Sequence, residues 1–120
     1  ESNRINQTER TKEEQVTIER LETIKKEIDI DIAPQVKEYE KDIKEFMTQT
    51  IKTEKEKDKQ IYKAAYLGEQ LMHILFNLDG ISCGQDFLEA RRLRKEAVKV
   101  AQTLLDKVDD IKSILKSVKE

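Results

Sequence analysis

Apolar residues recur along this chain in three stripes, at intervals of three, four or seven residues. The first stripe consists of Leu21, Ile24, Ile28, Ile32, Val36, Tyr39, Ile43 and Phe46. The second consists of Ile61, Ala64, Gly68, Leu71, Leu75 and Leu78. The third consists of Leu93, Ala97, Val100, Leu104, Ile111, Leu115 and Val118. Such intervals keep each set on one face of an α-helix, so the pattern predicts three amphipathic helices at about residues 16–52, 57–80 and 86–118.

The composition agrees with an all-α fold. Charged residues make up 40% of the 120 residues and aromatic residues 5%, with three Gly and one Pro. Such a chain holds little turn material and is rich in residues that favour long helices. Helices joined by short links pack side by side in opposite directions. We therefore expect an antiparallel three-helix bundle over residues 16–120, after a flexible or frayed segment at residues 1–15.

Pro34 interrupts the first stripe. Proline has no N–H to donate, and its ring crowds the carbonyl group four residues back, at Ile30. The helix therefore either kinks here or ends, with a new helix starting after Asp31 or Ala33. Because the stripe keeps its phase through Pro34, one long, kinked helix is the preferred interpretation.

Two short segments are expected to join the helices. The charge run Ile51–Gln60 is either a loose linker or, preferably, a solvated helix end. In the second segment, Gly80 and Gly84 can adopt the left-handed conformation that ends a helix. The carboxylate of Asp86 can then accept from the free N–H groups that open the third helix.

The sequence offers few residues for catalysis or metal binding. It contains one His, His73, and one Cys, Cys83, whereas a structural zinc site needs about four such ligands. No calcium-binding or glycine-rich phosphate loop is present. A hydrolase built on His73 and Cys83 would require the two side chains to reach hydrogen-bond distance, with no third residue to orient them. We expect no enzymatic activity and no cofactor.

Charge and hydropathy limit the partners and the compartment. The net charge of −2 lacks the basic excess that nucleic-acid binding needs. No run of about 18 apolar residues occurs, so we expect no direct membrane contact. A single cysteine cannot form an internal disulfide, which indicates a reducing, cytoplasmic or cytosol-facing compartment. Since the sequence begins with Glu1 rather than Met, an anchor or targeting segment further upstream remains open.

Polar and charged residues gather on the second and third predicted helices. On the second helix, Glu69, Met72, Phe76 and Asp79 lie along one line beside the apolar stripe. Met72 and Phe76 can also be the edge of the core. On the third helix the corresponding line consists of Arg91, Arg94, Lys95, Gln102 and Asp109. Antiparallel packing would place acids opposite cations, which suits a protein partner that carries both signs of charge. An ordinary solvated surface of salt bridges is the alternative.

The span Glu69–Asp109 resembles the signature half of the BAG domain family. Members of that family are cochaperones that promote nucleotide exchange on heat-shock protein 70. Their pattern is a Glu, an acid at the end of helix two, an Arg-Lys pair, a Gln and a final Asp. It is matched without a gap by Glu69, Asp79, Arg94, Lys95, Gln102 and Asp109. The first half resembles the family only as a long amphipathic helix, and short-bundle members, including the membrane-tethered fungal type, are the most similar.

The resemblance implies a function without chemistry. Related domains dock helices two and three on the nucleotide-binding domain of heat-shock protein 70, and monomeric binding is expected here. By analogy Arg94 and Lys95 would pair with acids of the chaperone, Glu69 and Asp79 with its basic groups, and Gln102 would form hydrogen bonds. Arg91 and Arg92 would steer association. The expected exposure of Arg94 implies that Arg94→Ala weakens binding without affecting stability.

A structural or tethering bundle is the alternative function. It would bind another helical protein through the first helix, without exchange activity. This role requires an apolar strip that remains exposed after the three stripes have packed together.

Two further expectations concern packing. Gly68 costs a helix about 1 kcal/mol relative to Ala, so we expect it to mark a close approach of two helices. Leu104 is expected in the core, so that Leu104→Ala costs about 2–5 kcal/mol.

Overall fold

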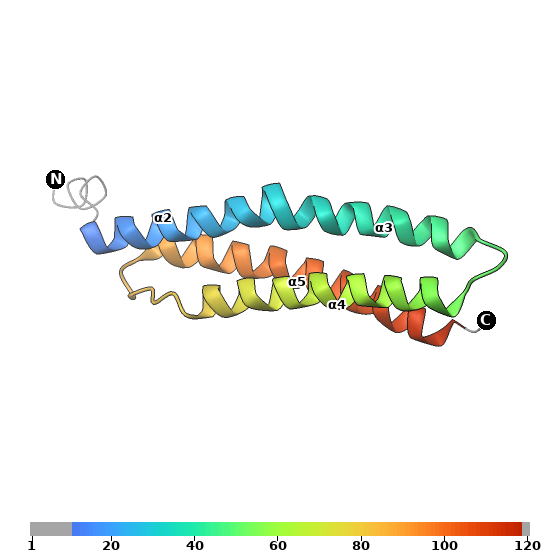
Figure 1. Ribbon diagram of the computed structural model, residues 1–120. Helices are drawn as coiled ribbons and strands as arrows, with labels where there is room; N and C mark the ends of the chain where they lie inside the picture. The colour runs from blue at the N-terminus through green and yellow to red at the C-terminus, as the bar shows by residue number, and fades with distance from the viewer. Residues whose placement is uncertain (1–10, 119–120) are drawn as a thin grey trace.

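Three long helices form an antiparallel bundle in a computed structural model that describes residues 11–118 (Figure 1). The elements are α2 (Lys12–Glu27), a π-helical turn η1 (Ile28–Ile32), α3 (Ala33–Thr48), α4 (Glu54–Asp79) and α5 (Leu88–Ser117). No strand occurs among the described residues. α2, η1 and α3 join into one helix of 37 residues, so the predicted all-α bundle with a long first helix is confirmed. The rod measures 70 × 20 × 15 Å.

Threonine caps explain why two helices begin earlier than expected. The Thr11 hydroxyl accepts a hydrogen bond from the N–H of Glu14 at 3.1 Å, which starts α2 at Lys12. The Thr53 hydroxyl likewise accepts from the N–H of Glu56 at 3.1 Å, so most of the charge run 51–60 forms the first turns of α4. Of the segment expected to be frayed, residues 1–10 lie outside the described residues, and residues 12–15 are helical.

The chain passes Pro34 through a π-turn rather than a break. The N–H of Ala33 bonds to the carbonyl of Ile28, five residues back, which widens the helix directly before the proline. This turn also explains the spacing of the first stripe. In an α-helix every step of four residues overshoots a full turn by about 40°. Three successive steps of four residues, from Ile24 to Val36, would therefore rotate these side chains away from the core. The π-turn has more residues per turn and brings them back to the side that faces the core.

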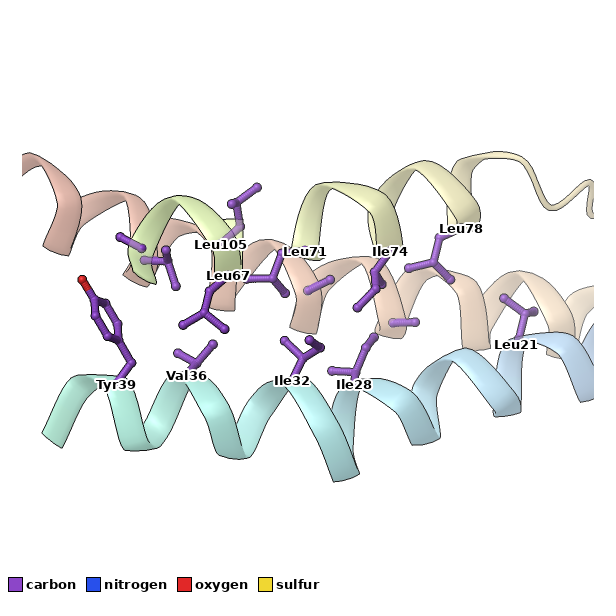
Figure 2. Packing of buried hydrophobic residues seen from close by; sticks show 14 of the residues in the cluster. Leu21, Ile28, Ile32, Val36, Tyr39, Leu67, Leu71, Ile74, Leu78 and Leu105 are labelled. Carbon is purple, nitrogen blue, oxygen red and sulfur yellow. The ribbon is translucent and has the colours of Figure 1, made fainter. Parts of the chain in front are cut away.

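The buried residues confirm the first predicted stripe and show that the buried face of the second helix is wider than predicted. Seven of its eight members are 8% exposed or less, and Ile24 is partly buried against them. On α4 the core also includes Leu67 and Ile74, which lie beside the predicted stripe and face the first helix (Figure 2). α4 therefore buries a broad arc, because it packs between two neighbours.

The buried line on α5 is partly displaced from the predicted stripe. Ala97 and Leu115 are buried as expected, and Leu93, Leu104 and Ile111 pack against the core as partly buried residues. Val100 is 40% exposed, so its expected place in the core is wrong. The buried line instead consists of Ala90, Ala97, Ala101, Leu105, Val108 and Leu115. Three of these buried residues are alanines, whereas the larger Leu104 packs against the core from a partly exposed position.

The link between α4 and α5 differs from the expectation in two respects. No described residue has a positive φ, and Gly80 has φ −77° and ψ −9°, in the right-handed helical region. α5 begins at Leu88 without a side-chain cap, so Asp86 does not serve as its N-cap. A backbone bond from the N–H of Phe87 to the Gly84 carbonyl at 3.0 Å shapes the entry instead.

Tyr39 joins α3 of the first helix to α4. Its ring is 3% exposed, and its hydroxyl donates to the carbonyl of Gln60 at 2.7 Å. Desolvation by burial raises the pKa of Tyr39 to about 12, so the group is a protonated donor at neutral pH. Figure 2 shows the ring extending from α3 toward the opposite helices.

Truncation of Leu71 tests the core assignment. Leu71 is 0% exposed at the centre of the bundle, so Leu71→Ala should lower the free energy of unfolding by about 2–5 kcal/mol. Leu104→Ala should cost clearly less, because Leu104 keeps solvent contact. Urea denaturation of both variants measures the difference. A loss at Leu104 equal to that at Leu71 would contradict the displaced stripe.

Gly68 offers a test in the opposite direction. A Cβ atom at this position would lie 3.8 Å from Leu105 Cδ1 and 4.0 Å from Val108 Cγ1, which are ordinary van der Waals distances. Gly68→Ala should therefore stabilise the helix by up to about 1 kcal/mol. The matched control, Ala65→Gly on the exposed side of α4, should destabilise it by a similar amount. Thermal unfolding measures both variants. A lower melting temperature of Gly68→Ala would show that the space beside Gly68 does not accommodate a methyl group.

Candidate functional site

A groove runs between α4 and α5 at the end of the bundle that carries their link. Its floor is apolar and includes Leu75, Leu78 and Val98. Five of the nine residues predicted to bind a partner line this groove, namely Asp79, Arg91, Arg94, Lys95 and Gln102. Antiparallel packing brings the last turn of α4 beside the first turns of α5. An acid therefore stands on one wall and cations on the other.

Arg94 is partly buried, contrary to the exposure expected from the sequence. Its guanidinium Nη1 donates to the carbonyl of Ile81 at 2.8 Å, and Ile81 is itself 1% exposed. The hydrogen bond holds the link against α5 and satisfies a carbonyl that follows the last residue of α4. Arg94 thus has a structural role in addition to lining the groove.

Arg92 is fixed by two acids of its own helix. Its guanidinium forms ion pairs with Glu89 and, at 2.7 Å, with Glu96. The hydrogen bond to Glu89 and the charges of both acids raise the pKa of Arg92. The two acids offset the charge of Arg92, so it contributes less to steering than the sequence suggested. Arg91 and Lys95, in contrast, are exposed on the groove and have no ion-pair partner among the described residues.

The remaining predicted residues lie outside the lining of the groove. Met72 is 58% exposed and Phe76 is 78% exposed, so neither belongs to the edge of the core. Glu69 shares this outer side of α4, where its Oε1 lies 4.0 Å from Nε2 of His73. Phe76 borders a hollow toward α2 instead of the groove. Asp109 is exposed further along α5.

Leu88 is a groove residue that the sequence interpretation missed. It is 74% exposed and lines the groove at the start of α5. The signal was present, because Leu88, Lys95 and Gln102 follow one another at intervals of seven residues and so share one face of the helix. An exposed leucine beside charged residues adds apolar area to a surface that otherwise offers charge.

The residues that suggested other classes of function are separated. His73 lies on the outer side of α4 beside Glu69, whereas Cys83 packs against the core, and no hydrogen bond joins them in the described part of the chain. Residues 11–118 contain no group of three or more His, Cys, Asp or Glu placed to hold a metal ion. Within the same residues, no helix has the length and apolar content needed to cross a membrane.

The first helix carries no continuous apolar strip that a tethering partner could cover. Its large exposed hydrophobic residues are Val16, Ile30 and Met47, which are far apart along the helix. The exposed apolar residues on α4 and at the start of α5 are Tyr62, Tyr66, Met72, Phe76 and Leu88. Surface available for recognition therefore concentrates on α4 and α5.

The family model of the BAG domain matches residues 21–111. The chain belongs to the BAG domain family. The match includes almost all of the bundle and every one of the nine predicted binding residues. No curated protein matches the chain.

BAG domains are protein-binding domains of cochaperones, and they generally bind the ATPase domain of heat-shock protein 70 proteins. They are not a known enzyme family. Membership therefore indicates a protein-binding domain, and the groove between α4 and α5 is a candidate for its binding surface.

Replacing Arg94 and Lys95 in turn separates their roles in stability. Arg94→Ala should lower the free energy of unfolding by about 1–3 kcal/mol, because it leaves the buried Ile81 carbonyl without its donor. Lys95→Ala should change it by less than about 0.5 kcal/mol, since the side chain is exposed. Urea denaturation measures both. Equal stability of Arg94→Ala and the parent protein would show that this hydrogen bond is unimportant.

Proposed function

We propose that this BAG domain binds the nucleotide-binding domain of heat-shock protein 70 and accelerates the release of ADP. The groove between α4 and α5 is the proposed contact surface. The observation that carries the proposal is the meeting of Asp79, Arg91, Lys95 and Gln102 along one groove in a domain of this family. We also propose a cytoplasmic or cytosol-facing compartment, which the single cysteine favours.

Each polar side chain of the groove has a distinct contribution. Arg91 and Lys95 would pair with carboxylates of the chaperone, and the planar guanidinium of Arg91 suits bidentate pairing. Asp79 would form an ion pair with a basic side chain of the same partner. Gln102 donates to Asp106 at 3.0 Å in the free domain and keeps its amide carbonyl available for a hydrogen bond across the interface.

Met72, Phe76 and Leu88 would supply the apolar part of the interface. All three are exposed by more than half. Leu88 lines the groove, whereas Met72 and Phe76 lie on the outer side of α4, with Phe76 one helical turn before Asp79. Burial of large apolar side chains beside a charged rim is the arrangement found in stable protein interfaces. Glu69 and Asp109 would extend the polar rim along the two helices.

Exchange would follow from differential binding to two forms of the chaperone domain. A surface that fits the open form better than the closed form shifts the population toward the open form, by no more than the difference in affinity. ADP is held less tightly by the open form and leaves faster. The bundle can impose such a shape because Arg94 holds the link to α5, and the ion pairs of Arg92 fix the first turns of that helix.

The release rate of a fluorescent ADP analogue from heat-shock protein 70 tests the proposal. The parent domain should accelerate release. Lys95→Ala and Asp79→Asn should each reduce the acceleration about ten-fold or more at subsaturating domain, because each removes a charge from the contact surface. Neither change should alter the melting temperature.

Lys107→Ala is the matched control, since Lys107 is an exposed lysine of α5 outside the groove. This variant should accelerate release as the parent does. Absence of acceleration by the folded parent domain would refute exchange activity. If Lys95→Ala and Lys107→Ala reduced the acceleration equally, the contact surface would not be the groove.

A further inference from the structure

A second groove, between α3 and α4, lies outside the proposed chaperone-binding surface. Only a few residues of α3 pack against α4, whereas α5 packs along most of the length of α4. The space left beside α3 is lined by Tyr39, Tyr62 and Tyr66. These are all three tyrosines of the chain. Gathering every tyrosine at one groove is a feature that core packing alone does not require.

Two of these tyrosines add little to the core. Tyr62 is 73% exposed and Tyr66 is 49% exposed, and they lie four residues apart on one side of α4. Neither hydroxyl has a hydrogen-bond partner within the described residues. Tyr39 forms the buried end of the groove, with its hydroxyl held by the Gln60 carbonyl at 2.7 Å. Aromatic faces are therefore available to a ligand along the α4 wall.

The opposite wall, on α3, is acidic. Glu38 and Asp42 line the groove four residues apart, so both carboxylates lie along the row that faces the tyrosines. Lys63 of α4 reaches Asp42 at 3.8 Å and neutralises part of its charge. Glu38 has no ion-pair partner among the described residues. The groove thus combines aromatic faces with net negative charge.

The groove continues toward the link between α3 and α4, past the shared residues Asp42 and Lys63. Its continuation is lined by the acids Glu45 and Glu56 and also by Lys59 and Gln60, so three acids and two lysines border this part of the groove. The side-chain Oε1 of Gln60 is buried and has no hydrogen-bond partner among the described residues. Because this atom has no exposed surface, it is not a contact point for a docked ligand.

We propose that the groove between α3 and α4 is a docking site for a basic segment of a protein partner, with an arginine or lysine side chain held between Tyr62 and Tyr66. Cations bind to aromatic faces and to carboxylates, and both are supplied here by opposite walls. An acidic segment would be repelled by the α3 wall, and a purely apolar segment could pack on the tyrosines but would leave the Glu38 carboxylate unpaired. The site lies on a different side of α4 from the groove lined by Lys95, so both sites can be occupied together.

Intrinsic fluorescence provides a direct test. The chain has no tryptophan, so its tyrosine emission reports on this groove alone. Titration of the full chain with the peptide acetyl-Gly-Ser-Arg-Gly-Ser-Arg-Gly-amide should change the emission in a saturable manner. The same peptide with Glu in place of Arg should have no effect. The absence of a change at millimolar arginine peptide, or an equal response to both peptides, would overturn the proposal.

Calorimetry on variants locates the binding site. Replacing both Tyr62 and Tyr66 by Ala should weaken binding of the arginine peptide about ten-fold or more. Glu38→Gln should weaken it several-fold. Val16→Ala, which truncates an exposed apolar residue on α2, is the control and should bind as the parent does. Lys95→Ala should also bind normally, which separates this site from the proposed exchange function.

Two results would assign the groove to another occupant or to none. Unchanged affinity in the double tyrosine variant would show that the peptide binds elsewhere. An increase in mass with protein concentration in sedimentation experiments, accompanied by a change in tyrosine emission without peptide, would show that a second copy of the chain covers the groove. Either result contradicts docking of a basic segment.

Discussion

The close packing of α4 against α5 is the interaction on which the rest of the structure depends. Gly68 of α4 lies against Leu105 and Val108, and the fully buried Ala97 and Ala101 present small side chains to the neighbouring helices. This approach fixes both walls of the charged groove at the end of the bundle. The hydrogen bond from Arg94 to Ile81 then holds the link that joins the two walls. A recognition surface built in this way is ordered before the partner arrives, which reduces the entropic cost of binding.

The long first helix contributes in a different manner. It packs on α5 mainly through α2, whereas α2, η1 and α3 each make only limited contact with α4. The sparse contact leaves an acidic and aromatic groove that is separate from the charged groove. The two grooves lie on different sides of α4, so one helix serves two surfaces. If both proposals hold, the chaperone and the second protein would bind on separate surfaces of the bundle.

Much of this arrangement could be predicted from the sequence, and the exceptions have physical causes. Helical spacing identified the three helices because periodicity survives tertiary packing. It missed Ala90, Ala101, Leu105 and Val108 in the buried face of α5, because a single stripe is narrower than the face that packs against two neighbouring helices. The π-turn before Pro34 was not predicted, although three successive steps of four residues indicate a wider turn. The partial burial of Arg94 could not be foreseen, since its acceptor is a backbone carbonyl of the link.

The affinity of this domain for the nucleotide-binding domain of heat-shock protein 70, measured with and without ADP, tests the central claim most directly. Differential binding requires that each ligand weakens the other by the same factor. Differential binding therefore predicts that saturating ADP lowers the affinity of the domain for the chaperone by about five-fold or more, a factor typical of coupled sites. Equal affinity in the presence and absence of ADP would contradict it, because a domain that binds both forms of the chaperone equally cannot drive exchange.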